Sequence, residues 1–268
     1  MKPDITNKLP EECISYILSF TSPIDVCRSK LVSPVFRSAA DSDTIWGKFL
    51  PPDCYDIISN SSSSSNQLVA SMSKTQLYFH LCNNPVVIDN GTMVNSFGLD
   101  KATGKKCYML AARRLSIAWS NTPNYWRWRH LPESRFSEVA ELRQVWWLDV
   151  KGTIETKILS PKTTYVAYLV YKFATPRYGF EKKPVDLHVE LEQSDAGRTF
   201  RVFLDPSENI PQFSRERGDG WMEVKLGEFF NEHGDDGKAI CSLREVDNYI
   251  PKKGLIVEGI DIRPKDIR

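Results

Sequence analysis

The segment from Trp119 to Trp128 concentrates side chains that could bind a ligand by stacking. Three of the seven tryptophans of the chain, Trp119, Trp126 and Trp128, are interleaved here with amides, a proline and arginines. Indole faces pack well against the C–H faces of sugar rings, and amide and guanidinium groups can hydrogen-bond to sugar hydroxyls. The same composition could stack nucleic-acid bases. It could also be part of a core, because Trp126 and Trp128 would lie on the same face of a strand.

No pattern in the sequence marks a catalytic or metal centre. The six cysteines contain no C-x-x-C pair, and the four histidines contain no H-x-x-x-H pair and no cysteine at ligand spacing. There is also no G-x-S-x-G motif. Glycoside hydrolysis would require two positioned carboxylates, and no motif singles out a pair among the 34 acidic residues. We therefore expect a non-catalytic protein with no metal, no cofactor and no catalytic residue, and glycoside hydrolysis as a minor alternative.

The charge balance limits the partners that the chain can bind by electrostatics. Its 35 Lys+Arg residues against 34 Asp+Glu give a formal net charge of +1. This argues against attachment to nucleic acid or to an anionic membrane by bulk charge. The sequence begins without the apolar segment of a secretory signal, and no apolar run approaches the roughly 18 residues that cross a bilayer. We expect a soluble protein of the cytoplasm or nucleus, with no nucleic-acid or membrane partner.

A serine-rich run, Ser59–Asn66, divides the chain. Such a polar run cannot bury enough apolar area to offset its ordering entropy, which predicts a flexible linker. The apolar spacing over Gln67–Cys82 then predicts a short amphipathic helix that bridges the two halves. We therefore expect a first domain over residues 1–50, the linker and bridging helix over 51–84, and a second domain over 85–268.

The first domain is predicted to contain three short helices. Residues typical of a helix N-terminus occur at Leu9-Pro10-Glu11-Glu12, at Ser22-Pro23-Ile24-Asp25 and at Ser33-Pro34. Three short helices can hardly bury a core of their own. They are therefore either a small cap on the larger domain or a module that a partner completes.

The order of the motifs in this region resembles an F-box. Leu-Pro-Glu-Glu, Ile-x-x-Ile-Leu, Ser-Pro-x-Asp-Val and Ile-Trp follow one another within residues 8–50. F-box proteins dock onto a Skp-type adaptor, which joins them to a cullin–RING ubiquitin ligase, so the resemblance implies an adaptor role without catalysis. From spacing alone, the apolar residues of the first helix could equally be internal core. The resemblance places six residues in or near the adaptor interface, namely Leu9, Pro10, Ile14, Ile17, Leu18 and Val26.

The second domain is predicted to be all-β. Apolar and polar residues alternate over 185–192, as expected of a half-buried antiparallel strand. Turn residues separate the strand patterns, and many short strands without alternating helices indicate a sandwich or a barrel. One short helix is predicted over Ser134–Leu142. Further strands are predicted over 152–159, 163–173, 199–204, 222–226 and 255–262.

The motifs of the second domain resemble those of the phloem-protein-two lectins, the family of the Nictaba-related lectins. The likeness is carried by Gly104–Arg113, Leu115–Trp119, Thr122–Trp128, Asp219–Glu223 and Gly254–Ile260, and it covers roughly residues 85–265. Together with the F-box, the chain resembles plant F-box proteins of the phloem-protein-two type. The fold class that this implies is an α+β multidomain chain, in which a short all-α F-box module precedes an all-β, jelly-roll-like lectin sandwich.

The resemblance also implies a ligand. These lectins bind N-acetylglucosamine oligomers and N-glycan structures through two tryptophans seven residues apart, and the matching positions are Trp119 and Trp126. On one regular strand the two rings would face opposite ways, so a shared site requires Asn121–Asn124 to turn the chain. Trp128 is predicted to be core. The function implied is a substrate receptor that captures glycoproteins or other targets for the ligase. The alternative is a carbohydrate- or protein-binding module without a ligase role.

Overall fold

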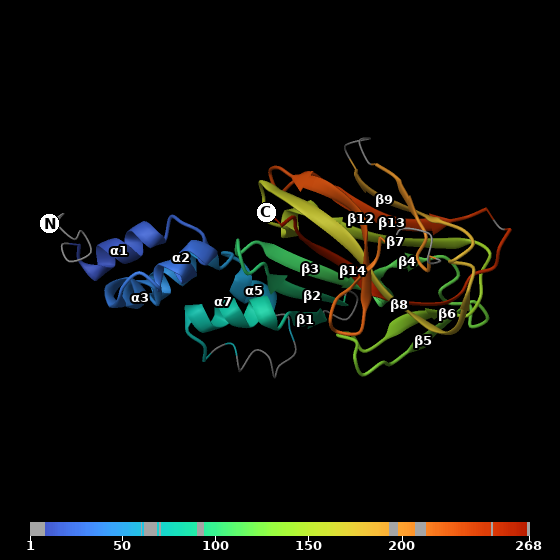
Figure 1. Ribbon diagram of the computed structural model, residues 1–268, viewed down its shortest axis with the longest axis horizontal. Helices are drawn as coiled ribbons and strands as arrows, with labels where there is room; N and C mark the ends of the chain where they lie inside the picture. Colours follow the sequence, from blue (N-terminus) through green and yellow to red (C-terminus); the bar gives the residue numbers. More distant parts are fainter. Residues whose placement is uncertain are drawn as a thin grey trace. The chain divides into compact units, whose positions relative to one another are not determined.

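The computed structural model describes residues 9–59, 61, 69, 71–89, 94–192, 198–206, 213–247 and 249–266. Contacts between residues divide the chain into two compact units, shown in Figure 1. The first comprises Met1–Asn90 and Phe97–Lys106, and the second Gly91–Ser96 and Cys107–Arg268. Apart from Ser59 and Ser61, the predicted serine-rich linker lies outside the described residues.

The first unit is built from short helices. Serine caps begin two of them at predicted starts: the hydroxyl of Ser22 accepts the N–H of Asp25, and that of Ser33 accepts the N–H of Phe36. Ser42 and Ser73 cap two further helices. In chain order the helices are α1 (Glu11–Leu18), α2 (Pro23–Ser29), α3 (Pro34–Ala40), α4 (Asp43–Phe49), α5 (Cys54–Ser59) and α7 (Lys74–Asn83).

Trp46 lies at the centre of the first unit. Its side chain is fully buried, and its indole N–H donates to the carbonyl of Ala40 at 2.8 Å. Its ring lies 4.9 Å from the rings of Tyr78 and Phe79, both on α7. The helix that the sequence predicts as a bridge therefore packs on α4 and belongs to the helical unit.

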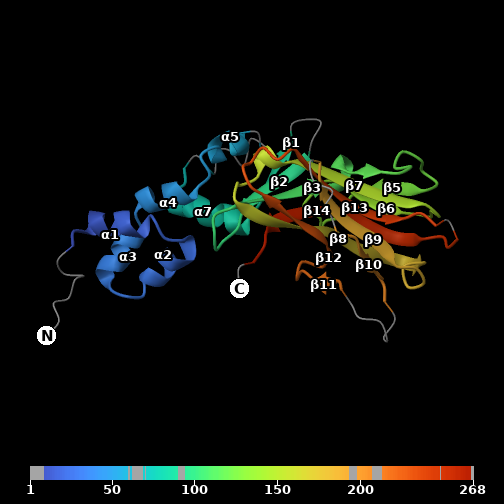
Figure 2. The same cartoon turned by 90° about the horizontal axis from the view of Figure 1, so that it is seen from above.

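The second unit is an antiparallel β-sandwich, seen from two directions in Figures 1 and 2. β1 (Val86–Asp89) belongs to the first unit, and the boundary between the units falls inside β2 (Val94–Leu99) and β3 (Lys106–Ala111). From β3 the larger sheet continues with β14 (Lys253–Pro264), β8 (Thr163–Tyr178), β12 (Met222–Asn231) and β11 (Arg215–Glu216), while β6 (Val139–Leu142) pairs with β14 and with β5 (Trp126–Arg129).

The smaller sheet faces the larger one across the core. In its strand β7 the side chains of Leu148, Val150 and Ile154 are buried, whereas those between them reach the surface. A Cβ atom at Gly152 would lie 2.8 Å from Cδ1 of Ile260 on β14, so glycine allows the two sheets to approach closely here. The strand order is β10 (Phe200–Val202), β9 (Val185–Leu191), β13 (Lys238–Glu245), β7 (Leu148–Glu155) and β4 (Ser116–Ile117).

The predicted helix over Ser134–Leu142 is wrong. Its second half is strand β6, which pairs with β5 on one side and with β14 on the other. Val139, Ala140 and Leu142 are buried there. Pairing on both edges outweighs the helix-like spacing of these residues. Among the described residues, no helix combines the length and the apolar character needed to cross a membrane.

Candidate functional site

Trp119 stands out of the sandwich on a sharp turn between β4 and β5. Its side chain is 57% exposed and its φ is 66°, in the left-handed region that bulky residues rarely adopt. The carbonyl of Trp119 accepts the N–H of Thr122 at 2.8 Å, and Thr122 in turn accepts the N–H of Tyr125 at 2.9 Å. The chain therefore turns between Trp119 and Trp126, as a shared site would require.

Two indoles of β5 hold the peptides on either side of Trp119. Trp126 donates its indole N–H to the carbonyl of Ala118 at 3.0 Å, and Trp128 donates to the carbonyl of Ser120 at 3.2 Å. Residues two apart on a strand share a face, so both N–H groups reach the same turn. These two hydrogen bonds fix the backbone of Trp119 in its unfavourable conformation and keep its ring exposed.

A pocket of about 230 Å³ opens beside Trp119. It is lined by Trp119, Tyr125, Val145, Trp146 and Trp147, and we call it the aromatic pocket. Trp146 and Trp147 are both exposed, and the rings of Trp119 and Tyr125 meet edge to face with centroids 6.1 Å apart. Three exposed indoles around one hollow are unusual on a protein surface and are suited to an amphipathic ligand such as a sugar. The sequence reasoning missed Trp146 and Trp147, although their direct adjacency was visible.

Lys252 supports the aromatic pocket from the interior. This side chain is 1% exposed, and its ammonium donates to the carbonyls of Trp146 at 2.6 Å and Ile250 at 3.0 Å. It also forms a buried ion pair with Glu245. Backbone hydrogen bonds in both directions join Lys252 to Val145. Because breaking a buried pair is strongly destabilising, these contacts anchor the segment that carries the two tryptophans.

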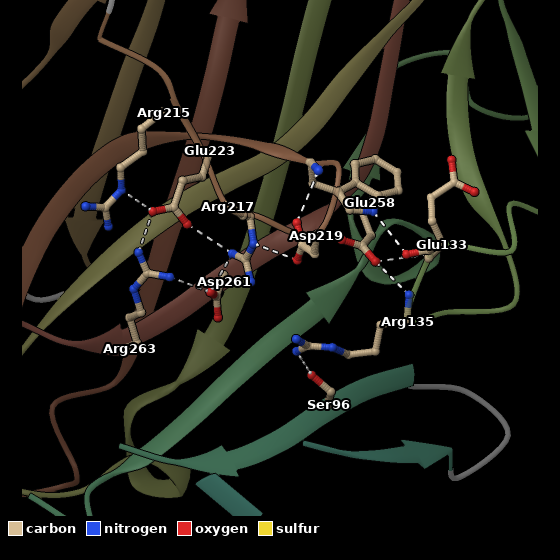
Figure 3. A network of polar contacts seen from close by, with 12 residues as sticks. Ser96, Glu133, Arg135, Arg215, Arg217, Asp219, Glu223, Glu258, Asp261 and Arg263 are labelled. Carbon is tan, nitrogen blue, oxygen red and sulfur yellow. Dashed lines mark hydrogen bonds and ion pairs between the residues drawn. The ribbon is translucent and has the colours of Figure 1, made fainter. Parts of the chain in front are cut away.

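A charge network joins side chains of β11, β12 and β14 (Figure 3), and none of them lines the aromatic pocket. The carboxylate of Glu223, 3% exposed, accepts hydrogen bonds from Arg215 at 2.5 Å, Arg217 at 3.0 Å and Arg263 at 2.6 Å. Asp261 accepts from Arg217 at 2.9 Å and Arg263 at 3.1 Å. Burial opposes ionisation of Glu223, but the arginines outweigh it and lower its pKa. The charges satisfy one another, so the network is a structural element.

Glu258 is the buried acid at the other end of the network in Figure 3. It is 4% exposed and accepts hydrogen bonds from the N–H of Arg135 at 2.8 Å and the hydroxyl of Ser134 at 3.1 Å. Burial raises its pKa despite these bonds. The guanidinium of Arg135 donates to the hydroxyl of Ser96 at 2.7 Å. Glu258 thus fixes the segment that leads into β6.

The helical unit exposes an unusual number of large apolar side chains. Leu31 is 83% exposed and Ile17 is 55% exposed. The ammonium of Lys48 lies 4.3 Å from the ring centre of Phe20, at the border of this set. These exposed apolar side chains all lie within residues 9–32, where a partner could cover them. We call it the apolar surface, and it consists of Leu9, Tyr16, Ile17, Phe20, Ile24, Leu31 and Val32.

Comparison with known proteins identifies both parts of the chain. The family model described as phloem protein 2 matches residues 105–264, and the F-box domain model matches residues 7–48. The chain belongs to the phloem protein 2 family. From Arabidopsis thaliana, F-box protein PP2-B10 is 43% identical over 97% of this chain and 94% of its own length. F-box protein At2g02240 of the same plant is 41% identical over 96% of this chain and 79% of its own length.

Solved structures resemble this phloem protein 2 family member only weakly. The C-terminal family 22 carbohydrate-binding module of Clostridium thermocellum Xyn10B has a TM-score of 0.31 and 14% identity over 55% of this chain and 85% of its own. A β-(1,4)-mannanase of Podospora anserina has a TM-score of 0.35 and 10% identity over 60% of this chain and 28% of its own. The assignment to the family therefore rests on the family models and not on the solved structures. The family models confirm the resemblance to plant F-box proteins of the phloem-protein-two type and the fold class of a helical module followed by a β-sandwich.

The two tryptophans predicted to bind sugar have different environments. Trp119 presents its ring to solvent, whereas Trp126 is 2% exposed and offers no free face. Trp128, predicted as core, is only half-buried, and the guanidinium of Arg113 lies 3.7 Å from its ring centre. The core indole of β5 is therefore Trp126. A need for both Trp119 and Trp126 in glycan binding stays a prediction, with Trp126 acting through the turn that it holds.

The six residues predicted for the adaptor interface are divided between surface and core. Leu9, Pro10 and Ile17 are exposed, so they can contact a partner directly. The other three are buried inside the helical unit, where they hold its helices together. Sequence reasoning missed five members of the apolar surface because an isolated helical pattern does not show which face a neighbouring helix covers. The buried residues are Ile14 at 2%, Leu18 at 7% and Val26 at 0% exposure.

The arginines beside the tryptophans are engaged with acidic side chains. Arg127 and Arg129 both donate to Glu141, at 2.7 and 2.8 Å, and Arg113 donates to Glu138 at 2.8 Å. Burial opposes ionisation of Glu141, but the two arginines lower its pKa overall. Because each of these guanidinium groups is already engaged with a carboxylate, the arginines are poorly placed to bind the phosphates of a nucleic acid.

Proposed function

We propose that this protein is the substrate-recognition subunit of a cullin–RING ubiquitin ligase. Its helical unit binds a Skp-type adaptor through the apolar surface, and its β-sandwich captures glycosylated targets at the aromatic pocket. The protein itself is an adaptor, and its partners supply the catalysis. The F-box match over residues 7–48, which contains every member of the apolar surface, supports the adaptor half of this proposal.

The glycan half depends on one observation, the three exposed indoles of the aromatic pocket. Each indole can cover the C–H face of one sugar ring, and the amide and guanidinium groups near the turn can bond to hydroxyls. The lectins of this family bind N-acetylglucosamine oligomers, so we propose these oligomers, and N-glycans that contain them, as the ligand class.

Two binding measurements test the proposal on the full chain. Calorimetry with chitotriose should show binding, with cellotriose, which lacks the acetamido groups, as the weaker-binding control. The oligosaccharide should be recovered intact afterwards, because hydrolysis would contradict an adaptor role. Co-expression with a Skp-type adaptor should give a complex that survives size-exclusion chromatography. Glycan binding without adaptor binding would reduce the protein to a carbohydrate-binding module, and the converse result would reject the lectin role.

A further inference from the structure

The outward face of the smaller sheet is hollowed into a groove of about 690 Å³, entirely within the second unit. Side chains from β4, β7, β13 and β9 line it. None of the residues discussed for the aromatic pocket or the apolar surface belongs to this lining. The groove is larger than the aromatic pocket, and neither the predicted sites nor the proposed function uses it.

Strand pairing places a row of polar side chains across the floor of the groove. Ser116 of β4 pairs with Lys151 of β7, Lys151 with Ser242 of β13, and Ser242 with His188 of β9. Residues directly opposite on neighbouring strands have Cβ atoms about 5 Å apart. The hydroxyl of Thr199 lies 3.2 Å from Nδ1 of His188 and continues the row. The row alternates hydroxyl groups with an ammonium and an imidazole, so it offers donors and acceptors at regular spacing.

Several groups in this row have capacity left for a ligand. Among the described residues, nothing forms a side-chain hydrogen bond with the hydroxyls of Ser116 or Ser242. Ser242 is 6% exposed as a residue and lines the groove, where its hydroxyl is open to a ligand. The ammonium of Lys151 has a single described ion pair, a long one of 3.6 Å to Asp149. Ser242 and Lys151 are therefore the groups whose polar atoms a ligand in the groove would satisfy.

The balance of charges that line the groove indicates which class of ligand it can bind. Lys151 and Arg244 are balanced by Asp186 and Glu190, so the lining has no surplus of either sign. A phosphate or a sulfate would require surplus cations. An extended peptide adds to the free edge of a sheet, whereas the groove lies on the face of strands already paired through their backbones. An uncharged chain rich in hydroxyls matches both the neutrality and the mixed donors and acceptors.

The groove and the aromatic pocket lie close to each other along β4 and β7. Ser116 lines the groove, and Trp119, three residues later, lines the pocket, so their Cα atoms are at most about 10 Å apart. Trp147 of the pocket precedes β7 directly, and Lys151 of the groove lies on that strand. The N–H of Ala118 donates to the carbonyl of Asp149 at 3.0 Å and joins the turn to β7. A ligand longer than the pocket can therefore extend over the groove.

We infer that the groove is an extended subsite for an uncharged oligosaccharide whose end is stacked in the aromatic pocket. This inference rests on the proposed glycan binding, which would supply that end. In the groove, the Lys151 ammonium donates to sugar hydroxyls, the Ser242 hydroxyl donates or accepts, and the Glu190 carboxylate accepts. Affinity then increases with chain length beyond the units that the pocket holds.

Calorimetry with N-acetylglucosamine oligomers of two lengths tests the groove on the full chain. We expect Lys151→Met and Ser242→Val to weaken binding of the hexasaccharide roughly three- to ten-fold while leaving binding of the disaccharide nearly unchanged. Lys151 is well exposed, so its variant should fold even if the buried Ser242→Val does not. Lys225→Met, on the larger sheet, is the matched control and should bind both oligomers like the parent.

The outcomes separate the groove from the pocket. Parent-like binding of the hexasaccharide by folded Lys151→Met, or equal weakening for both oligomers, would overturn the inference and leave the pocket in place. Failure of the parent to bind either oligomer would overturn both the inferred subsite in the groove and the proposed glycan binding. Preferential binding of an acidic oligosaccharide, or of an unglycosylated peptide, in the groove would overturn the assignment of its ligand.

Discussion

The buried indole of Trp126 donates its N–H to the carbonyl of Ala118 at 3.0 Å and so anchors the peptide directly before the exposed Trp119. The two tryptophans are seven positions apart, and they have different roles in the structure. One presents an aromatic face, and the other fixes the turn that makes this possible. The seven-residue spacing is therefore compatible with a shared site even though the two rings do not lie side by side on the surface.

Removing only the N–H of Trp126 tests this positioning role. Trp126→Phe keeps an aromatic ring in the core but leaves the Ala118 carbonyl without its donor, which should destabilise the protein by about 1–3 kcal/mol in urea unfolding. Glycan affinity should fall several-fold because the Trp119 turn loses its anchor, although Trp126 has no exposed face. Parent-like glycan affinity in a measurably destabilised Trp126→Phe variant would show that this hydrogen bond serves the fold alone.

Replacing Trp119 should weaken glycan binding without lowering stability, whereas Trp126→Phe should lower both. Trp119→Gly removes the stacking face, which should weaken glycan binding by on the order of 1–3 kcal/mol by analogy with base stacking. Glycine adopts the φ of 66° without strain, so the variant should unfold at a urea concentration equal to or higher than the parent's. Trp119→Ala is the control that loses the ring but keeps the left-handed strain. Undiminished glycan binding by Trp119→Gly would remove Trp119 from the site.

Short sequence patterns predict the helices and strands whose formation depends on interactions between residues close together in the chain. The proline and serine starts of α1, α2 and α3 are such signals, because a cap interacts with residues only three positions away. The alternation that predicts β9 works for the same reason. The helix predicted over Ser134–Leu142 fails because Val139 and Leu142 satisfy a helical period, while their environment is set by β5 and β14, distant in sequence.

The site is less predictable than the fold for a similar reason. The motif points to Trp119, but its exposure depends on a positive φ and on hydrogen bonds from β5, which composition does not show. Trp146 and Trp147 join it only after the sheet has formed, because their place beside Trp119 depends on the pairing of β4 with β7. Tertiary pairing thus assembles a pocket from two segments that carry no common sequence signal.

The neighbouring residues Ile17 and Leu18 provide a test of the apolar surface. Ile17 is 55% exposed, so Ile17→Asp should leave the protein folded and abolish co-purification with a Skp-type adaptor. Leu18 is 7% exposed, so Leu18→Asp should lose adaptor binding through unfolding of the helical unit, visible as lost helical circular dichroism. Glycan binding should persist in Ile17→Asp. Tyr55→Asp, exposed on α5 outside the F-box match, should retain the adaptor. Adaptor recovery with Ile17→Asp at parental yield would contradict this interface.

The buried acid Glu258 predicts a pH dependence of stability. Burial raises its pKa, so the folded protein binds the proton more tightly than the unfolded chain does. The stability that this proton contributes is complete below the ordinary pKa of glutamate, about 4.3, and is lost as pH rises through the higher folded-state pKa. The loss amounts to about 1.4 kcal/mol for each unit by which folding raises the pKa.

Glutamine at position 258 isolates this effect, because it keeps an acceptor oxygen for Ser134 and Arg135 but does not ionise. Relative to the parent, Glu258→Gln should gain stability as pH increases from about 4 to 8, measured by urea unfolding at each pH. Glu138→Gln is the control of opposite sign: the hydrogen bond from Arg113 lowers the pKa of Glu138, so that variant should lose stability relative to the parent over the same range. Any constant offset from the amide group cancels, because only the change with pH is compared. A difference between Glu258→Gln and the parent that stays flat from pH 4 to 8 would mean that folding leaves the pKa of Glu258 at its ordinary value.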